Sequence, residues 1–184
     1  MIFVTVGTQG RFDRLIRTVD EWAGLRGKTD VFAQTGLSSY CPTHLRAEPF
    51  MSPTEFRKRV ELASFVIAHA GMGSIITALE LGKQIIVMPR LKNLGEHRND
   101  HQVATAKRFA EQGRILAAFN EQELFDKLDH LEMLNKTERL SAEASPHLIV
   151  TIRTFIETGR IIMSESNSSA EASMWRAPML RKEW

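Results

Sequence analysis

The sequence lacks most features of secreted and membrane-spanning proteins. Its 184 residues include one cysteine, Cys41, so no internal disulfide framework is available and a reducing compartment is expected. No apolar run reaches the roughly 18 residues that a transmembrane helix requires. The opening segment, MIFVTVGTQG, lacks the basic start and the long apolar core of a signal peptide. We therefore expect a soluble cytoplasmic protein.

A large excess of charge of one sign is also missing. Lys and Arg together number 24 and Asp and Glu together number 22, which gives a formal net charge of +2. General nucleic-acid-binding proteins carry a larger basic excess, so we expect no nucleic-acid partner. The hydrophobic share of 43% and the charged share of 25% are ordinary for a globular protein. The length suits one main domain, which we place at residues 1–135.

Within this domain, short β-type runs alternate with helical patterns. The predicted strands cover residues 2–6, 30–34, 64–69, 84–88 and 114–118. The predicted helices cover residues 12–23, 71–81, 99–111 and 120–134, and another begins at Ser52 with a capping box to Glu55. This alternation implies βαβ crossovers. The sequence therefore predicts an α/β fold, a Rossmann-like parallel sheet with helices on both faces.

Two further segments follow the domain. Residues 147–163 have the pattern of an amphipathic C-terminal helix, and residues 164–184 begin with a Ser-, Glu- and Ala-rich stretch that has little to bury. We predict that 164–184 is a mobile tail. Its aromatic and basic residues, among them Trp175 and Arg176, suit either contact with a partner or membrane surface or plain solvation, and we favour solvation.

Three polar loops follow predicted strands, at residues 7–10, 69–74 and 89–102. Ligands of open parallel sheets bind beyond the carboxyl ends of the strands. Glycines allow close approach of the backbone, and the helix that follows presents free N–H groups to an anion. One such loop alone can be no more than a tight connection, but the three together predict a nucleotide-type ligand.

Other site types have weaker support. The loop GTQG does not supply GxGxxG, and GxxxxGK[ST] is absent, so neither common nucleotide motif is present. His97 and His101 would share a helix face, as in zinc sites, but no clear third ligand accompanies them, and we expect no metal. His69 suits either a core position or a phosphate contact. Ser74 suits capping of the helix that it opens.

Four blocks of sequence point to one family. VTVGT (4–8), HAGMGSI (69–75), LELGKQIIVMPR (79–90) and GEHRNDHQ (95–102) resemble the C-terminal domain of family 28 glycosyltransferases, over about residues 1–118. A start at the first strand resembles split enzymes of this family, such as the dolichol-pathway UDP-N-acetylglucosamine transferase subunit and bacterial exopolysaccharide glucuronosyltransferase subunits. The resemblance implies the donor-binding half of a GT-B fold, which holds a UDP-sugar as substrate and needs no further cofactor.

The resemblance also implies a set of donor-binding residues. Matching motif positions and their neighbours are Gly7, Thr8, Gln9, His69, Gly71, Met72, Gly73, Ser74, Thr77, Glu80, Arg90, His101 and Gln102. The glycine loops would hold the diphosphate, while His101 and Gln102 would meet the sugar. The family often has a ribose-binding glutamate where this chain has Thr77, so ribose recognition would fall to Glu80 or another group. Arg90 would pair with a uronate carboxylate or be an ordinary surface charge.

The expected mechanism places the leaving diphosphate at helix N-termini and backbone N–H groups, with no need for a metal. In full-length relatives the acceptor site and the catalytic base lie on the other domain. We therefore expect a membrane-associated acceptor-binding glycosyltransferase subunit as partner, docked through 147–163. It would bring the chain peripherally to the inner face of the membrane, and a homo-oligomer is left open.

The acceptor would be a polyprenyl-diphosphate-linked saccharide in exopolysaccharide synthesis. The expected donor sugar is glucuronate, with N-acetylglucosamine as the alternative. A two-domain 2-epimerase and a UDP-sugar-sensing module without turnover are the rival interpretations, and the short chain disfavours the first.

Overall fold

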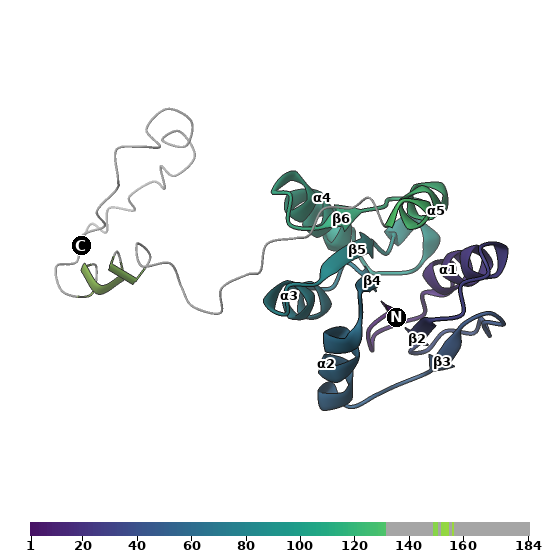
Figure 1. Ribbon diagram of the computed structural model, residues 1–184. Coiled ribbons are helices and arrows are strands. Elements are labelled where there is room, and N and C mark those ends of the chain that lie inside the picture. The colour runs from purple at the N-terminus through teal and green to yellow at the C-terminus, as the bar shows by residue number, and fades with distance from the viewer. Residues whose placement is uncertain (132–148, 151, 155, 157–184) are drawn as a thin grey trace. The chain divides into compact units, whose positions relative to one another are not determined.

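A six-stranded parallel sheet forms the centre of the protein (Figure 1). The computed structural model describes residues 1–131, 149, 150, 152–154 and 156, and it divides into two units, Met1–Ser141 and Ala142–Trp184. In the first unit the strands are β1 (Ile2–Thr5), β2 (Val31–Gln34), β3 (Arg46–Glu48), β4 (Phe65–His69), β5 (Gln84–Met88) and β6 (Leu116–Ala117). The helices are α1 (Asp13–Leu25), α2 (Pro53–Leu62), α3 (Met72–Glu80), α4 (His101–Glu111) and α5 (Glu121–Asp129), with a 3-10 turn, η1, at Lys92–Leu94.

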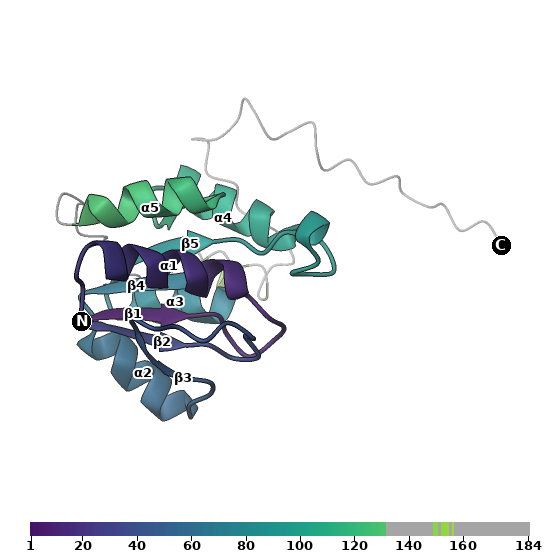
Figure 2. The same cartoon turned by 90° about the vertical axis from the view of Figure 1, so that its right-hand side faces the viewer.

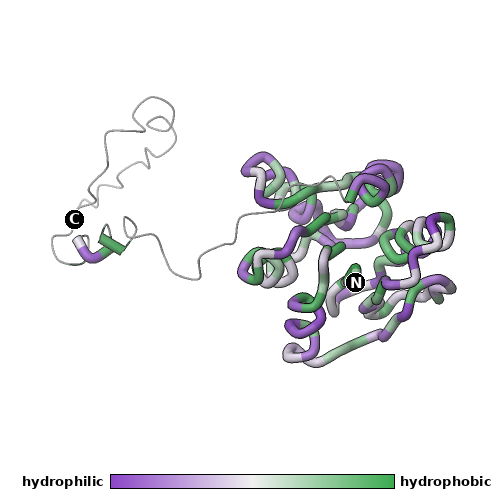
Figure 3. The backbone as a smooth tube through the Cα atoms, viewed as in Figure 1, coloured by the Kyte–Doolittle hydropathy of each residue, from purple (hydrophilic) through white to green (hydrophobic). Residues whose placement is uncertain are grey.

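Alternate residues of the strands supply two separate hydrophobic layers. Val4 and Ile67 face α1 and α5, whereas Phe3 and Val66 face α2, α3 and α4. Figure 2 shows α1 and α5 side by side on their face of the sheet. Every strand pair is parallel, and both faces are covered, as predicted. In Figure 3 α2 is mostly hydrophilic, consistent with Val60 as its one buried residue.

The element boundaries differ from the predictions in a few places. Strand β3 was not predicted because Arg46–Glu48 is a short, polar edge strand without a hydrophobic pattern. Helix α4 begins at His101, two residues later than expected, with Asp100 as its N-cap. Helix α5 ends at Asp129 instead of near residue 134.

Helix starts show which capping predictions hold. The Ser52 hydroxyl accepts a hydrogen bond from Glu55 N at 3.2 Å, and the Asn120 side chain accepts one from Glu123 N at 2.8 Å. Helix α3 differs, because its N-cap is Gly71 and no side chain caps it. The prediction that Ser74 caps this helix is therefore wrong, since Ser74 lies inside the first turn.

Beyond the first unit, residues 149, 150, 152–154 and 156 are helical. The rest of the predicted helix 147–163 and all of the predicted tail 164–184 lie outside the described residues, so these remain predictions. Where the structure describes the chain, none of its helices has the length and apolar character to cross a bilayer.

The strand order β3-β2-β1-β4-β5-β6 determines where a ligand can bind. From β1 the chain first adds strands on one side, through β2 and β3, and then crosses to the other side at β4. The loops after β1 and β4 therefore leave the sheet in opposite directions and open a crevice between them. Open α/β sheets bind ligands at this switch point.

Candidate functional site

A cleft of about 570 Å³ lies at the switch point, along the carboxyl edge of the sheet. It is bounded by the loops after β1, β4 and β5 and by the start of α2. Its lining residues are Thr5, Gly7, Thr8, Gln9, Gln34, Met51, Pro53, Phe56, His69, Gly71, Gly73, Ser74, Thr77, Arg90, His97, Arg98, His101 and Gln102. The structure thus brings together every predicted donor-binding residue except Met72 and Glu80.

The two exceptions both lie on α3. Met72 is exposed, and it is not part of the cleft lining. Glu80 lies at the end of α3 and forms an ion pair with Arg57, with 3.5 Å between Oε2 and Nη1. The cleft is instead reached by Thr77, one turn earlier, whose hydroxyl donates a hydrogen bond to Gly73 O at 2.8 Å. The structure therefore does not place Glu80 where it could contact a ribose in this cleft.

The imidazole of His69 fills the space between the first two glycine loops. A Cβ added at Gly7, which has φ +72°, would lie 2.6 Å from His69 Cε1. A Cβ added at Gly71 would collide with the same ring. Both positions therefore need glycine because the ring packs against their backbone, and at Gly7 the positive φ adds a second reason. His69 is thus a spacer between the loops as well as part of the lining.

The surroundings of His69 also fix its charge. Burial, with a smaller contribution from the nearby positive charge of Arg90, lowers the pKa of His69 to about 4, against a contribution from the Thr5 backbone that raises it. The ring is therefore neutral at pH 7. A neutral imidazole has one N–H to donate, so His69 can contact a bound anion without contributing a full charge.

The N-terminus of α3 points unpaired N–H groups at the cleft. The hydrogen bond from Ile75 N to Gly71 O, at 3.2 Å, is the first of the helix. The N–H groups of Met72, Gly73 and Ser74 come before it, so they have no acceptor within the helix. Gly73 and Ser74 line the cleft, and a Cβ at Gly73 would meet nothing within 4 Å. This end of α3 can accept an anion from the cleft side.

Arg90 is not the surface charge that one of the sequence interpretations proposed. Its side chain is 2% exposed, and Nη2 donates hydrogen bonds to Val6 O at 2.9 Å and to Gly10 O at 3.1 Å. Burial lowers the pKa of Arg90, while the charge of Glu96 acts in the opposite direction. The guanidinium therefore holds the loop after β1. With Nη2 occupied in this way, the uronate role predicted for Arg90 is left with Nε and Nη1 as donors.

The third loop brings its own polar groups. Gln102 is 4% exposed, and its side-chain oxygen accepts a hydrogen bond from Arg90 N at 3.1 Å, which leaves its amide NH₂ group for other contacts. His101 contacts the side chain of Asn99, and its ring lies edge-on to the ring of His97, with 4.5 Å between centroids. Among the described residues, no three His, Cys, Asp or Glu side chains come together to hold a metal ion.

Several lining residues were missed from the sequence. Gln34 donates a hydrogen bond to Gly7 O at 3.0 Å and accepts one from the Thr5 hydroxyl at 2.5 Å, so it fixes the first loop. Its position as a polar residue at the end of a buried strand was an available signal. Met51, Pro53 and Phe56 form an apolar part of the lining and follow β3, the strand that was not predicted.

The lining has an unbalanced charge. It contains two arginines and three histidines but no aspartate or glutamate. Together with the unpaired N–H groups of α3, this composition favours an anionic ligand. The apolar surface of Met51, Pro53 and Phe56 adds a place for a flat, apolar group. Such a combination of features suits a nucleotide.

Comparison with known proteins agrees with this geometry. Residues 1–155 match the glycosyltransferase family 28 C-terminal domain. The chain belongs to this family. The family assignment made from the sequence blocks is thereby confirmed, and the match extends beyond the span of about 1–118 on which it was based.

Sequence relatives of this family 28 domain include the human UDP-N-acetylglucosamine transferase subunit ALG13. The two are 31% identical over 124 residues, which is 62% of this chain and 10% of the human protein. The mouse protein of the same name is 30% identical over 123 residues. The chain therefore spans only about a tenth of the length of these relatives.

Solved structures share the fold. The solution structure of ALG13 matches with a TM-score of 0.54 at 19% identity, over 85% of this chain and 95% of that one. A protein from Listeria monocytogenes described as a UDP-N-acetylglucosamine 2-epimerase matches with a TM-score of 0.57 at 13% identity, over 85% of this chain and 44% of that one. The predicted fold, the Rossmann-like half of a GT-B architecture, is confirmed.

Proposed function

We propose that this family 28 domain binds a UDP-sugar and serves as the donor subunit of a two-component glycosyltransferase. The observation that carries the proposal is the uncapped N-terminus of α3, which faces a cleft without carboxylates between two glycine loops. The diphosphate binds at Gly73 and Ser74, and the base lies against the apolar surface that begins α2. The sugar extends toward the loop after β5.

The chemistry that this arrangement supports is stabilisation of a leaving group. In the transfer, an acceptor hydroxyl attacks the anomeric carbon, and the bond from that carbon to the β-phosphate oxygen breaks. Negative charge then grows on the diphosphate. The N–H groups of Gly73 and Ser74 are already oriented toward it, so they stabilise this charge without rearrangement. The neutral ring of His69 donates one further hydrogen bond.

The reaction also needs a base that takes the proton of the acceptor hydroxyl. No carboxylate lines the cleft, so we assign this base to a partner, a membrane-associated subunit that binds a polyprenyl-diphosphate-linked saccharide. The word subunit in the name of the ALG13 relatives supports a two-component enzyme. In this proposal the chain acts at the inner face of the membrane, held there by its partner, in exopolysaccharide synthesis.

The proposed donor is UDP-glucuronate. Arg90 is engaged by Val6 and Gly10, so the carboxylate of the sugar pairs with Arg98, which lines the cleft between His97 and His101. Arginine suits this role because its planar fork matches a carboxylate. The second candidate is UDP-N-acetylglucosamine, which the name of the ALG13 relatives favours.

Titration calorimetry of the full chain tests the proposal. The ligands are UDP, UDP-glucuronate, UDP-N-acetylglucosamine and NADH. We expect both UDP and one UDP-sugar to bind while NADH gives no heat, and the preferred sugar identifies the donor. The variant Arg98→Gln should lose a preference for glucuronate and leave the affinity for UDP unchanged.

Two negative results have different meanings. If the chain binds nothing alone but binds a UDP-sugar when it is produced with its neighbouring acceptor subunit, the site needs its partner. If it binds nothing in either form, the donor-subunit proposal is wrong. Binding without sugar transfer in the presence of every candidate partner would instead favour a UDP-sugar-sensing module.

A further inference from the structure

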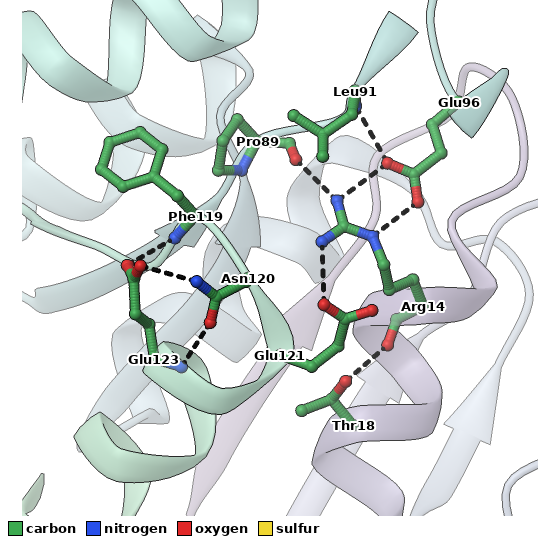
Figure 4. A network of polar contacts seen from close by, with 9 residues as sticks. All are labelled: Arg14, Thr18, Pro89, Leu91, Glu96, Phe119, Asn120, Glu121 and Glu123. Atoms are coloured by element: carbon green, nitrogen blue, oxygen red, sulfur yellow. Dashed lines mark hydrogen bonds and ion pairs between the residues drawn. The ribbon is translucent and has the colours of Figure 1, made fainter. Parts of the chain in front are cut away.

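The loop between β5 and α4 is fastened to α1 by a side chain that does not reach the cleft. Arg14 of α1 donates from Nε and Nη2 to the two carboxylate oxygens of Glu96, at 2.8 and 2.9 Å (Figure 4). Its Nη2 also donates to Pro89 O at 3.0 Å. The two side chains are 10% and 12% exposed, so this two-pronged ion pair is largely shielded from water.

A second arginine connects the loop after β5 to the loop after β1. Arg90, at the start of the loop after β5, donates to Val6 O and Gly10 O in the loop after β1. Strand β4 lies between β1 and β5 in the sheet, so the hydrogen bonds of Arg90 join loops whose strands are not neighbours. We call Arg14, Arg90 and Glu96 the arginine clasp.

Glu96 also shapes the loop from within. The carboxylate oxygen Oε2, which accepts from Arg14, accepts a second hydrogen bond from Leu91 N at 2.9 Å. Glu96 N in turn donates to Leu91 O at 3.1 Å. These contacts close the loop around η1 immediately before His97 and Arg98, which line the cleft. The direction in which those two residues leave the loop is therefore set by Glu96.

Neither Arg14 nor Glu96 is part of the cleft lining, so neither can act by touching a ligand there. We propose that Glu96, through its ion pair with Arg14, is a positioning residue that holds His97, Arg98 and His101 against the sugar of the donor. The contact of these residues with a sugar rests on the proposed function, whereas the role of Glu96 in holding the loop does not. In the proposed pose UDP does not reach His97, Arg98 or His101, so its binding should be nearly independent of the ion pair between Arg14 and Glu96.

The test uses the full chain and the variant Glu96→Gln, which keeps the shape of the side chain but not its charge. We expect the affinity for the preferred UDP-sugar to fall about tenfold, a loss typical of a disrupted charged hydrogen bond. The affinity for UDP should change less than twofold. A merely structural defect would weaken both ligands by the same factor, so equal losses, or no loss, would overturn the positioning role.

A matched control lies at the other end of α1. Arg26 donates to both carboxylate oxygens of Asp129 at 2.8 and 2.6 Å, in the same two-pronged geometry, at the amino edge of the sheet. Asp129→Asn removes an ion pair of the same geometry, though more exposed at 47% and 27%, between the C-cap of α1 and α5. We expect this variant to leave the ratio of the two affinities at its wild-type value.

Amide hydrogen exchange gives a readout that needs no ligand. Glu96→Gln should speed exchange in residues 91–101 at least several-fold, and Asp129→Asn should not affect them. Arg14→Lys, which keeps the charge but loses the planar fork, should act in the same direction as Glu96→Gln. Unchanged exchange in both clasp variants would show that the ion pair does not hold the loop.

Two further outcomes are informative. If Glu96→Gln does not fold because the charge of Arg14 keeps only its longer, 3.6 Å ion pair with Glu121, the double variant Arg14→Met, Glu96→Leu removes the charges of the clasp pair and should fold with the same loss of sugar selectivity. If the wild-type chain binds no UDP-sugar even with its partner, the proposed function and the sugar role both fail. Faster exchange in Glu96→Gln would then still establish that the clasp holds the loop.

Discussion

Asp20 and His69 are both buried ionisable side chains, but their surroundings stabilise the charged form of Asp20 and the neutral form of His69. Asp20 is 1% exposed and accepts hydrogen bonds from three backbone N–H groups, those of Thr43, His44 and Leu45, and from the Tyr40 hydroxyl at 2.8 Å. Burial alone would raise the pKa of Asp20, but these donors together lower it. His69 lies between glycine backbones with Arg90 nearby, and its pKa falls to about 4. One site keeps its charge and the other loses it.

The difference separates a structural polar site from a binding site. The carboxylate of Asp20 is satisfied by the loop that it fastens to α1, so no bonding capacity remains. In the described part of the chain, the buried side-chain atoms without a hydrogen-bond partner are Arg14 Nη1, His69 Nδ1 and Arg90 Nε. All three lie around the loops at the carboxyl edge. His69 and Arg90 line the cleft, where a ligand can use this bonding capacity, whereas Arg14 Nη1 lies outside the lining and 3.6 Å from Glu121 Oε2.

The largest expected effect concerns the structural side of this comparison. Asp20→Ala leaves three backbone N–H groups and the Tyr40 hydroxyl without their acceptor, and should lower the free energy of unfolding by about 4 kcal/mol. Urea unfolding measures this loss. Asp126→Ala, at an exposed position of α5, is the control and should change stability by less than about 0.5 kcal/mol. A small loss for Asp20→Ala would mean that the loop holds without this carboxylate.

The next effect tests the neutral state of His69. The folded protein binds this proton less readily than the unfolded chain, whose histidine pKa is 6.5. The stability from this group is therefore complete above pH 6.5 and is lost as the pH falls toward 4. The loss amounts to roughly 3 kcal/mol. His69→Gln should flatten the pH dependence of stability in this window, and an unchanged slope would contradict a neutral, buried ring.

A third prediction examines the cleft with a change that spares the fold. Gly73→Asp places a carboxylate in open space in the first turn of α3, where a negative charge is compatible with the helix. It should reduce the affinity for UDP about a hundredfold, or about 2.7 kcal/mol, through repulsion of the diphosphate. Gly73→Asn has nearly the same shape without the charge and should lose far less affinity. Equal losses in the two variants would point to crowding instead of charge.

The smallest effect is at the amino edge of the sheet. Hydrogen bonds from Arg26 hold the pKa of Asp129 at about 2, despite an opposing effect of burial, and Trp22 contributes a further hydrogen bond. The stabilisation is present above pH 3.8 and is lost as the pH falls through 2. In Asp129→Asn the free energy of unfolding, followed by acid titration, should no longer fall between pH 3.8 and 2 on account of this group. Between pH 4 and 6.5 its dependence on pH should stay as in the wild type, because His69 is unchanged.

The strands and loops that form the cleft could largely be predicted from local patterns in the sequence. The strands β4 and β5 were predicted because Phe65–His69 and Gln84–Met88 are nearly continuous apolar runs between clear turn residues. The cleft loops were predicted because they follow such strands. A glycine has no side chain that could turn toward a distant partner, so its place depends almost entirely on the local backbone. This explains why Gly7 and Gly73 lie in the cleft lining, as expected.

The missed features depend on contacts between distant parts of the chain. The side chain of Arg90 turns inward to carbonyl groups that lie 80 and 84 residues earlier in the sequence, which no local pattern specifies. Glu80, the last residue of α3, forms an ion pair with Arg57 of α2 and is not part of the cleft lining. Strand β3 exists because β2 offers it an edge, not because Arg46–Glu48 has β-type residues. Tertiary pairing decides such cases.

The central position of β1 has a consequence for how the chain is made. Ile2 pairs with Val31 on one side and with Phe65 on the other, so β1, the first strand of the sheet in chain order, acquires its second neighbour only after α1, β2, β3 and α2 have been synthesised. Until then an apolar strand has an open edge, and parallel pairing over such a separation is slow. Translation speed and chaperone capture in this interval should therefore govern the yield of folded protein more strongly than the stability of the finished sheet.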